Sequence, residues 1–488
     1  MKDSQDIDLK AIAWAAMENY GFTPAFPPSV LREVNALGTA AFTDGGEGAC
    51  NLRHLLWSSI DNHDSQDLDQ MEVCEEGGDG EILVRVAIAD VDACVPKDSK
   101  TDQHAAYNGT SVYTGVTTFP MLPPRLSEGI SSLLPGSDHR AVVIEYAVAP
   151  DGSVRHGGIY RAVVANKAKL VYEEVGDWLE GTGPAPEAVR DIPGLAEQIL
   201  LQHTAALRLK VRRTGQGALA LETIEAEPLV EDGRVTGLVV HRQNPAHCLI
   251  EEFMVAANGA LVACLRECDR PMIQRVVRTP KNWEGIVTEA AEHGEALPAK
   301  PDAAALTRFL IRQKQIDPER FPDLSLTVVK LMGAGEYVAF TPGTTPIGHF
   351  ALAVSDYTHG TAPNRRYVDV VIQRLVKSVL DGEASPYTPE DLEDLAAWLT
   401  GREKASQKVE RFVRKAAAAV LLRDRIGETF EAFVTGASEK GTYVRLIAPA
   451  AEGRVMRGEA GLRVGQKVRV RLLDTDPYKG FIDFERLR

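Results

Sequence analysis

Four aspartates crowd into nine positions near the start of the chain, within a segment whose flanks are apolar. The stretch SSIDNHDSQDLDQMEV, residues 58–73, carries Asp61, Asp64, Asp67 and Asp69. Carboxylates this close repel one another, which raises the free-energy cost of ionising each of them. A fold that holds them together must therefore place them against water, a basic partner or a metal ion.

A solvated, aspartate-rich turn is the simplest interpretation of this stretch. A calcium loop of the EF-hand type is excluded, because counting from Asp61, Asp64 or Asp67 never gives glycine at position six together with glutamate at position twelve. A magnesium site is the remaining alternative, since Mg²⁺ prefers oxygen ligands. In an extended segment Asp67 and Asp69 point to the same side, and Asp61 can return across a turn. The spacing permits a magnesium site without requiring one, so both interpretations stay open.

The composition is typical of a globular chain. Its 488 residues exceed what one hydrophobic core usually accommodates, so roughly two to four domains are expected. The sequence has neither an apolar run of the ~18 residues that span a bilayer nor a secretory signal pattern, so we expect a cytoplasmic protein without membrane association. The six cysteines lack zinc-site spacing and are expected to be free thiols.

Charge is unevenly distributed along the chain. The net charge of −15 argues against indiscriminate binding of polyanions. Positive residues are nevertheless concentrated in REKASQKVERFVRKAAAAVLLRDR, residues 402–425. This pattern is compatible with one local basic route on an otherwise acidic surface.

The elements expected from the sequence describe an α+β multidomain protein. Helices at 9–20 and 29–37 predict a small, helix-turn-helix-like unit, a pattern that is weak as a DNA-binding signal. Strands dominate from residue 81, with hairpin turns at Asp151-Gly152 and Asp232-Gly233. An apolar stripe at helical spacing predicts a core helix over 249–268.

The C-terminal half has a different pattern. Residues 280–425 are expected to be mostly helical, with a β-like interruption around 336–354. Short alternating segments separated by glycine and proline then predict a five-stranded small barrel over about 427–488.

A second charged motif lies about three hundred residues after the aspartates, in SDYTHGTAPNRRYVDVVIQRL, residues 355–375. Arg365 and Arg366 follow Pro363, which predicts a nearby helix start. A guanidinium at a helix N-terminus is suited to holding phosphate oxygens. An ordinary arginine–aspartate ion-pair network is the alternative, and taken alone the motif favours it.

Taken together, the motifs resemble the ribonuclease II (RNB) family of 3′-to-5′ exoribonucleases. IDNHDSQDLDQ resembles the acidic motif of that family, YTHGTAPNRRYVDVVIQRL its arginine block, and the terminal barrel an S1 RNA-binding domain with an OB-fold. VRVAIADVDACV, GTSVYTGVTTFPMLPPRLSEGISSLLPG and HCLIEEFMVAANGALV resemble successive family blocks between them. The resemblance implies a helical domain at 1–45, an RNB catalytic domain at 46–425 and an S1 domain at 427–488.

The resemblance also implies an activity and a set of site residues. The expected reaction is metal-dependent hydrolysis of single-stranded RNA from its 3′ end to nucleoside 5′-monophosphates by a two-metal mechanism, with Mg²⁺ as the ion and Mn²⁺ as an alternative. Asp61, Asp67 and Asp69, with Gln70, are expected to hold the metal, and Asp69 to activate the attacking water. Arg365 is expected to neutralise charge on the phosphate, and Arg366 to assist it or to support it structurally. Tyr113 is expected to stack on the 3′-terminal base, with an ordinary core tyrosine as the alternative.

In the barrel, the resemblance marks Tyr443 and Arg445 as RNA contacts, and the protein is expected to be a monomer. Three departures from the family pattern qualify these expectations. Gln70 stands where a fourth aspartate is expected, and Leu221 where a base-stacking phenylalanine is expected. The roughly fifty residues before the acidic stretch are too few for cold-shock domains, so the helical unit at 9–37 would replace them. A catalytically inactive RNA-binding member of the same fold is therefore the main alternative, and a duplex-DNA binder that uses the N-terminal helices is a more distant one.

Overall fold

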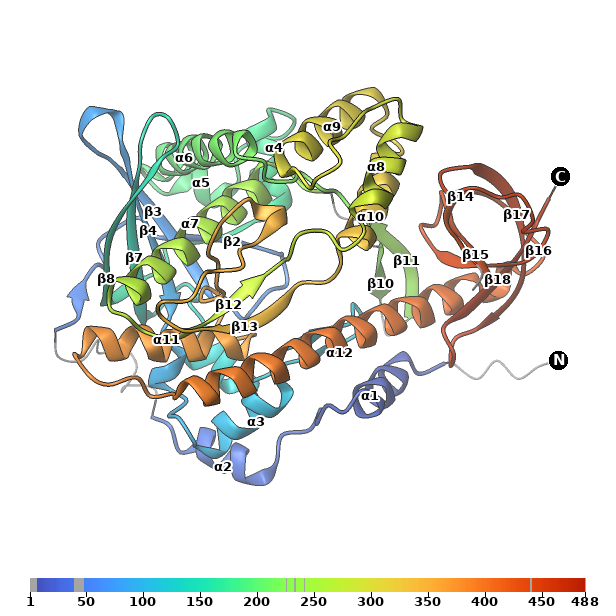
Figure 1. The fold of residues 1–488 in the computed structure, drawn as a ribbon. Helices are drawn as coiled ribbons and strands as arrows, with labels where there is room; N and C mark the ends of the chain where they lie inside the picture. Colours follow the sequence, from blue (N-terminus) through green and yellow to red (C-terminus); the bar gives the residue numbers. More distant parts are fainter. Residues whose placement is uncertain are drawn as a thin grey trace.

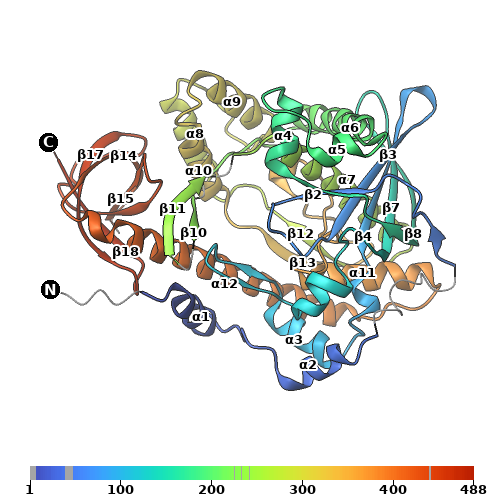
Figure 2. The ribbon, with the colours of Figure 1, turned by 180° about the vertical axis from the view of Figure 1, so that it is seen from behind.

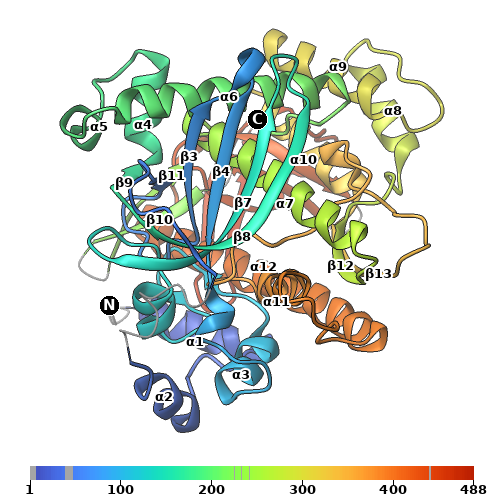
Figure 3. The same cartoon turned by 90° about the vertical axis from the view of Figure 1, so that its left-hand side faces the viewer.

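A mixed seven-stranded sheet forms the centre of the computed structural model, which describes residues 7–38, 48–224, 226–231, 234–240, 242–438 and 441–487. The strand order is β1-β8-β7-β4-β3-β2-β9, and all neighbours are antiparallel except the outer pairs β1–β8 and β2–β9 (Figure 1 and Figure 3). The strands are β1 (Cys50–Asn51), β2 (Ser58–Asp61), β3 (Gln70–Glu76), β4 (Ile82–Ala89), β7 (Asp138–Val148), β8 (Val154–Ala165) and β9 (Ala168–Val171).

The long hairpin of this sheet turns where the sequence predicts it. Strands β7 and β8 pair on either side of Asp151-Gly152, and Gly152 has φ of +78°. A Cβ at this position would lie 2.2 Å from the carbonyl oxygen of Arg208, so both the backbone conformation and the neighbouring helix require glycine. The other predicted turn, Asp232-Gly233, lies outside the described residues, but it joins two paired strands, β10 (Ala226–Glu231) and β11 (Arg234–Val240).

Helix α7 (Pro245–Glu267) confirms the predicted core helix and packs against β7 and β8. By length and composition alone α7 could cross a membrane, yet 61% of its apolar window is buried inside the protein, as in a core helix. Helices α4 (Tyr172–Glu180), α5 (Glu187–Asp191) and α6 (Leu195–Gly215) also contact the sheet, whereas α3 (Lys100–Asn108) packs on α2 and α11 (Tyr367–Leu380) packs on α7.

Helix α12 (Pro389–Leu422) connects the part of the protein that contains the sheet to the C-terminal barrel. A capping box between Thr388 and Asp391 starts it, and its 34 residues make it about 51 Å long. Figures 1 and 2 show it running from beneath the sheet to the barrel. Because one straight helix contacts both parts, it fixes the distance between them.

The two N-terminal helices pack on different partners. Helix α1 (Leu9–Asn19) lies along α12, and its buried residues share hydrophobic clusters with Val409, Val413, Ala416 and Ala417. Helix α2 (Pro28–Asn35) packs on α3, and its buried valines join the central core. Each helix is thus stabilised by the body of the protein, and an independent domain over residues 1–45 stays a prediction.

A helical group beside the barrel has its own hydrophobic cluster. It consists of α8 (Trp283–Glu292), α9 (Ala303–Ile316) and α10 (Phe321–Met332), and its cluster includes Trp283, Phe309 and Phe321. The predicted β-like interruption is present as β13 (Glu336–Phe340), which pairs with β12 (Met272–Val276).

The predicted five-stranded barrel is also present. Its strands close in the order β14-β15-β16-β18-β17 around a core that includes Val434, Val444 and Phe484. They are β14 (Thr429–Ser438), β15 (Gly441–Leu446), β16 (Glu452–Arg457), β17 (Lys467–Asp476) and β18 (Phe481–Arg486).

Candidate active site

A cavity of about 650 Å³ opens where β2 ends and β3 begins. The segment between these strands carries the acidic motif, so the crowded carboxylates lie at one edge of the sheet. The start of α11 and the two-stranded hairpin β5 (Val112–Tyr113) and β6 (Thr118–Phe119) approach the same edge. The polar lining residues that bear on its chemistry are Asp61, Asp64, Asp67, Gln70, Tyr113, Glu128 and Arg365.

Asp69 lies behind the cavity wall, bound to the arginine block. Its side chain is 2% exposed; Oδ1 accepts the backbone N–H of Asn364 at 2.8 Å, and Oδ2 accepts Nε–H of Arg365 at 3.2 Å. Burial raises the pKa of Asp69 to about 7, although the Arg365 guanidinium opposes this rise. The carboxyl group can therefore exchange a proton near neutral pH.

Asp67 and Tyr113 form a second polar contact in the cavity. The Tyr113 hydroxyl donates to Oδ2 of Asp67 at 2.6 Å. Burial raises the pKa of Asp67, and the hydrogen bond from Tyr113 partly offsets that rise. Tyr113 is 39% exposed, so the structure excludes the ordinary core tyrosine and leaves its ring accessible to a ligand.

Asp61 and Gln70 complete the set of oxygen donors. Asp61 ends β2 and accepts hydrogen bonds from Ser65 Oγ and from the backbone N–H of Asn62, each at 2.7 Å. Gln70 begins β3 and lines the cavity with its neutral amide. Asp61, Asp67 and Gln70 offer only oxygen ligands, which suits a hard cation such as Mg²⁺. Within the described ranges, however, no group of three histidine, cysteine or acidic side chains is already gathered as a metal cage.

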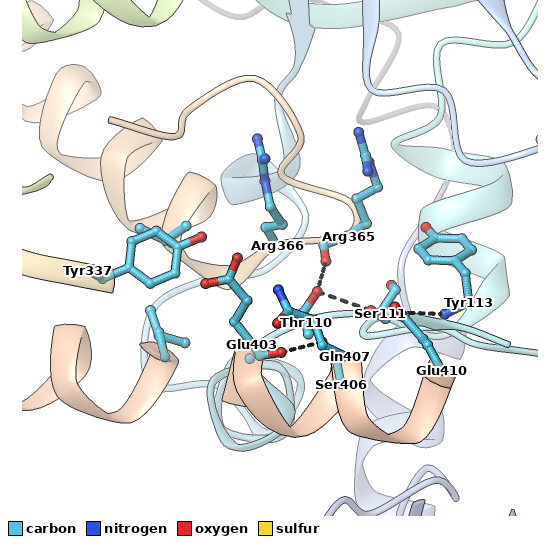
Figure 4. Close-up of a pocket in the computed structure, with 13 residues that line it drawn as sticks. Thr110, Ser111, Tyr113, Tyr337, Arg365, Arg366, Glu403, Ser406, Gln407 and Glu410 are labelled. Atoms are coloured by element: carbon cyan, nitrogen blue, oxygen red, sulfur yellow. Dashed lines mark hydrogen bonds between the residues drawn. The ribbon is translucent and has the colours of Figure 1, made fainter. Parts of the chain in front are cut away.

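Arg366 faces another partner than Arg365 does. It occupies the N-cap position of α11 without a side-chain capping bond, and its guanidinium binds both carboxylate oxygens of Asp369 at 2.7 and 2.8 Å. Both arginines also border a smaller pocket of about 210 Å³ against α12. In Figure 4 Tyr113 and Tyr337 lie on opposite sides of this pocket, and Glu403, Gln407 and Glu410 extend from α12. The contact of Arg366 with Asp369 favours structural support over direct assistance.

Leu221, which stands at a position expected to face RNA bases, and Arg445, an expected RNA contact, both make other interactions in this structure. Leu221 packs against the hydrophobic cluster of α8–α10, away from the lining of the acidic cavity. Arg445 donates from Nη2 to both oxygens of Asp323 on α10, at 3.0 and 3.1 Å, and only 14% of its side chain is exposed. Both side chains are thus engaged in packing between parts of the protein, which the local sequence pattern could not show.

Tyr443 lies in a groove of about 530 Å³ between the barrel, α12 and α10. Lys330, Arg411 and Lys415 line the same groove, and Lys415 Nζ lies 5.9 Å from the centre of the Tyr443 ring. The groove therefore combines an aromatic face with positive charge.

The structure adds site residues that the sequence reasoning did not single out. Asn364 contributes its backbone N–H to Asp69, and its place inside the quoted arginine block was the available signal. Tyr172 lines the acidic cavity and stacks on His247 with a ring distance of 4.1 Å. The sequence does not indicate that Tyr172 and His247 are in contact, because this contact depends on how α4 packs on α7.

Comparison with known proteins agrees with this architecture. Residues 50–382 match the family model described as the RNB domain, and residues 428–487 match the one described as the RNase II-type exonuclease C-terminal S1 domain. Ribonuclease R of Thermotoga maritima is 29% identical over 488 residues, covering 94% of this chain and 68% of that protein.

Two solved structures share the fold. Mycoplasma genitalium RNase R in complex with ribose-methylated single-stranded RNA aligns with a TM-score of 0.86 at 21% identity, over 98% of this chain and 78% of that chain. Yeast Ssd1, described as a pseudonuclease, aligns with a TM-score of 0.71 at 16% identity, over 95% of this chain and 57% of that chain. The same fold thus occurs in a pseudonuclease, so the fold by itself does not establish catalysis.

Proposed function

The chain belongs to the RNB-domain family, and from this premise we propose that it hydrolyses single-stranded RNA from the 3′ end and releases nucleoside 5′-monophosphates. The observation that carries the proposal is the meeting of the acidic motif with Arg365 at one cavity, although the two motifs lie about three hundred residues apart. Carboxylates beside an arginine are the groups that metal-assisted phosphodiester hydrolysis requires.

Each site residue has a distinct role in this proposal. Asp61, Asp67 and Gln70 would hold Mg²⁺, or Mn²⁺ in its place, which supplies charge stabilisation and an activated hydroxide at the scissile phosphate. Asp69 is assigned the deprotonation of the attacking water, as the family resemblance implies, although in this structure its carboxylate lies behind the cavity wall and binds Asn364 and Arg365. Arg365 is 47% exposed and neutralises negative charge that develops on the phosphate oxygens.

RNA recognition is proposed to use the exposed Tyr113 and the half-buried Tyr443. The Tyr113 ring stacks on the 3′-terminal base, a contact that tolerates any sequence. Farther along, the groove with Tyr443, Lys330, Arg411 and Lys415 holds the strand between the barrel and α12. Because its ion pair with Asp323 occupies the guanidinium, we assign Arg445 to barrel docking instead. We further propose a monomeric, cytoplasmic protein.

The alternative is an RNA-binding member of the fold without catalytic activity. Gln70 favours it, because an amide removes one negative charge from the proposed metal site and cannot accept a proton as a carboxylate does. This alternative predicts tight binding of single-stranded RNA without shortening of the strand.

A time course on 5′-labelled single-stranded RNA separates the two functions. The reactions contain Mg²⁺ or EDTA and use the unmodified protein, Asp69→Asn and the surface variant Asp138→Asn as a charge-matched control. We expect mononucleotide release that requires the metal, persists in Asp138→Asn and is lost in Asp69→Asn, while all three proteins bind the RNA. Binding of RNA by the unmodified protein without any shortening would instead establish the inactive alternative.

A further inference from the structure

Two neighbouring serines lie behind the acidic cavity. Ser131 and Ser132 follow the short π-helical turn η4 (Leu126–Ile130), and the two residues are 6% and 0% exposed. The turn itself lines the cavity through Ser127 and Glu128. A buried hydroxyl group must be hydrogen-bonded, because burying it without a partner is costly. The partners of the two serines lie on the two motifs that meet at the cavity.

Ser132 holds the acidic motif from the inside of the protein. Its Oγ donates to the carbonyl oxygen of Gln66 at 2.5 Å and accepts the backbone N–H of Leu68 at 2.9 Å. These two groups belong to the residues on either side of Asp67. The backbone N–H of Leu133 also donates to the carbonyl oxygen of Leu68, at 3.0 Å. Ser132 therefore fixes the backbone from which the Asp67 side chain reaches the cavity.

Ser131 holds the arginine block, 233 positions away. Its hydroxyl shares one hydrogen between Oδ1 of Asn364 at 2.6 Å and the carbonyl oxygen of Leu126 at 2.8 Å. Asn364 is 0% exposed, and within the described part of the chain its Nδ2 has no hydrogen-bond partner. The Ser131 hydroxyl therefore fixes this amide. Asn364 precedes Arg365, and its backbone N–H binds Oδ1 of Asp69 at 2.8 Å.

These contacts connect the two motifs by a route that does not use the Arg365 side chain. The route runs from Asp69 to Asn364 and Ser131, and then across one planar peptide to Ser132 and the acidic motif. The Arg365 guanidinium lies against Asp69, and a phosphate would compete for the same donors. If the ion pair alone joined the motifs, an arginine that turns toward a phosphate would release them from each other.

We propose that Ser131 and Ser132 are positioning residues for the reaction. Ser132 fixes the backbone that presents Asp67, and Ser131 fixes the backbone that presents Arg365. The two motifs thus stay together while the guanidinium exchanges Asp69 for a phosphate. This inference rests on the proposed function, because it assumes that the cavity binds a divalent cation and an RNA phosphate.

The test compares Mn²⁺ affinity, measured by calorimetry on the full chain without RNA, with the single-turnover rate at saturating RNA and Mn²⁺. Ser132→Ala should weaken Mn²⁺ binding by about 10-fold, because Asp67 is no longer held in place. Ser131→Ala should leave Mn²⁺ affinity within a few-fold and lower the rate by about 10-fold, because Arg365 is misplaced. Ser325→Ala is the matched control and should change neither quantity: Ser325 is 0% exposed and accepts the backbone N–H of Glu222 at 3.2 Å, in the helical group.

A second pair of variants tests the Ser131 contact itself. Asn364→Leu removes the same hydrogen bond from the other side and keeps the backbone N–H that binds Asp69. Its loss of rate should match that of Ser131→Ala. The double variant should lose little more than either single variant, because the same bond is missing in all three. Additive losses would overturn the assignment of Ser131.

The inference and the proposed function fail in different ways. Unchanged Mn²⁺ affinity in Ser132→Ala, or equal losses of affinity in Ser132→Ala and Ser131→Ala, would overturn the inference while RNA degradation by the unmodified chain stands. A chain that neither binds Mn²⁺ nor degrades RNA overturns the proposed function together with the inference. Thermal unfolding shows whether each variant is folded. If Ser132→Ala is not, Ser132→Cys keeps the size and a weak donor and should lose a few-fold in Mn²⁺ affinity, and an unchanged affinity would again overturn the inference.

Discussion

Nε of Arg365 lies 3.2 Å from Oδ2 of Asp69, although 296 positions separate the two residues in the chain. The contact joins the beginning of α11 to the beginning of β3, and the backbone N–H of Asn364 binds the other oxygen of the same carboxylate. One ion pair thus fixes the arginine block against the acidic motif. This arrangement places a partly exposed guanidinium directly beside the carboxylates that line the cavity.

Replacing Arg365 is expected to impair catalysis more than RNA binding. Arg365→Ala should lower the single-turnover rate by ~10²- to 10³-fold, because it removes one donor to the charge that develops on the phosphate. Arg365→Lys should restore only part of the rate, since an ammonium lacks the planar fork of donors. RNA affinity measured with EDTA should change by no more than a few-fold. A variant that loses affinity and rate in parallel would indicate that Arg365 acts in binding alone.

Two substitutions separate the ring of Tyr113 from its hydroxyl group. Tyr113→Ala should weaken binding of an RNA 3′ end by about 10-fold, because stacking on an aromatic face is worth ~1–3 kcal/mol per base. Tyr113→Phe keeps the ring and should bind RNA normally, but it loses the hydrogen bond to Asp67. Because that bond stabilises the carboxylate, the Mg²⁺ concentration for half-maximal rate should rise in Tyr113→Phe. Tyr107→Ala, an exposed tyrosine on α3, serves as the control in the same assays.

The ion pair between Arg445 and Asp323 is expected to hold the barrel on the helical group. Their side chains are 14% and 8% exposed, so removing either partner leaves a buried charge and should cost about 3 kcal/mol of docking free energy. The barrel has its own hydrophobic core, so Arg445→Ala should loosen the barrel without unfolding it. Small-angle scattering and proteolysis near the end of α12 measure this change.

A double variant checks that interpretation. Arg445→Ala combined with Asp323→Ala should cost less than the two single changes added together, since no unpaired charge remains. Additive effects would show that the ion pair makes no net contribution to docking. Arg471→Ala, which removes a half-exposed pair with Glu485 on the barrel surface, should leave the scattering profile unchanged.

Acid should destabilise the protein partly through His349. Burial, aided by the nearby Arg275 and Arg213, lowers the pKa of His349 from 6.5 to about 4. As the pH falls, the unfolded chain therefore binds a proton at this histidine before the folded chain does. The contribution of His349 to the free energy of unfolding is fully present above pH 6.5 and is lost as the pH falls toward 4.

His349→Asn should reduce that loss, because asparagine can accept the hydrogen bond from Leu352 N–H without titrating. We expect the melting temperature of the variant to fall less steeply than that of the unmodified protein between pH 6.5 and pH 4. Parallel melting curves over this range would show that His349 does not contribute. Some slope should persist in either case, since burial also lowers the pKa of His359.

Much of the local structure follows from short-range patterns. The apolar residues of β7 and the turn chemistry of Asp151-Gly152 act over a few positions, so the long hairpin is predictable from them. The apolar stripe of α7 and the alternation of the barrel strands are equally local. The acidic motif and the arginine block were identifiable for the same reason, because each lies within a continuous stretch of sequence.

The use of individual side chains depended on contacts between distant elements. The family resemblance marks Arg445 as an RNA contact, but α10 brings Asp323 against it. Turning Arg445 toward RNA would leave the buried Asp323 carboxylate unpaired, which is costly. The N-terminal helices have helical patterns of their own, yet α12 and α3 offer each of them a separate apolar surface. The sequence by itself therefore determined which helices and strands form and which residue types are available for catalysis. Only the tertiary structure decided that Asp69 meets Arg365 and that Arg445 meets Asp323, because such contacts depend on the packing of elements more than a hundred residues apart.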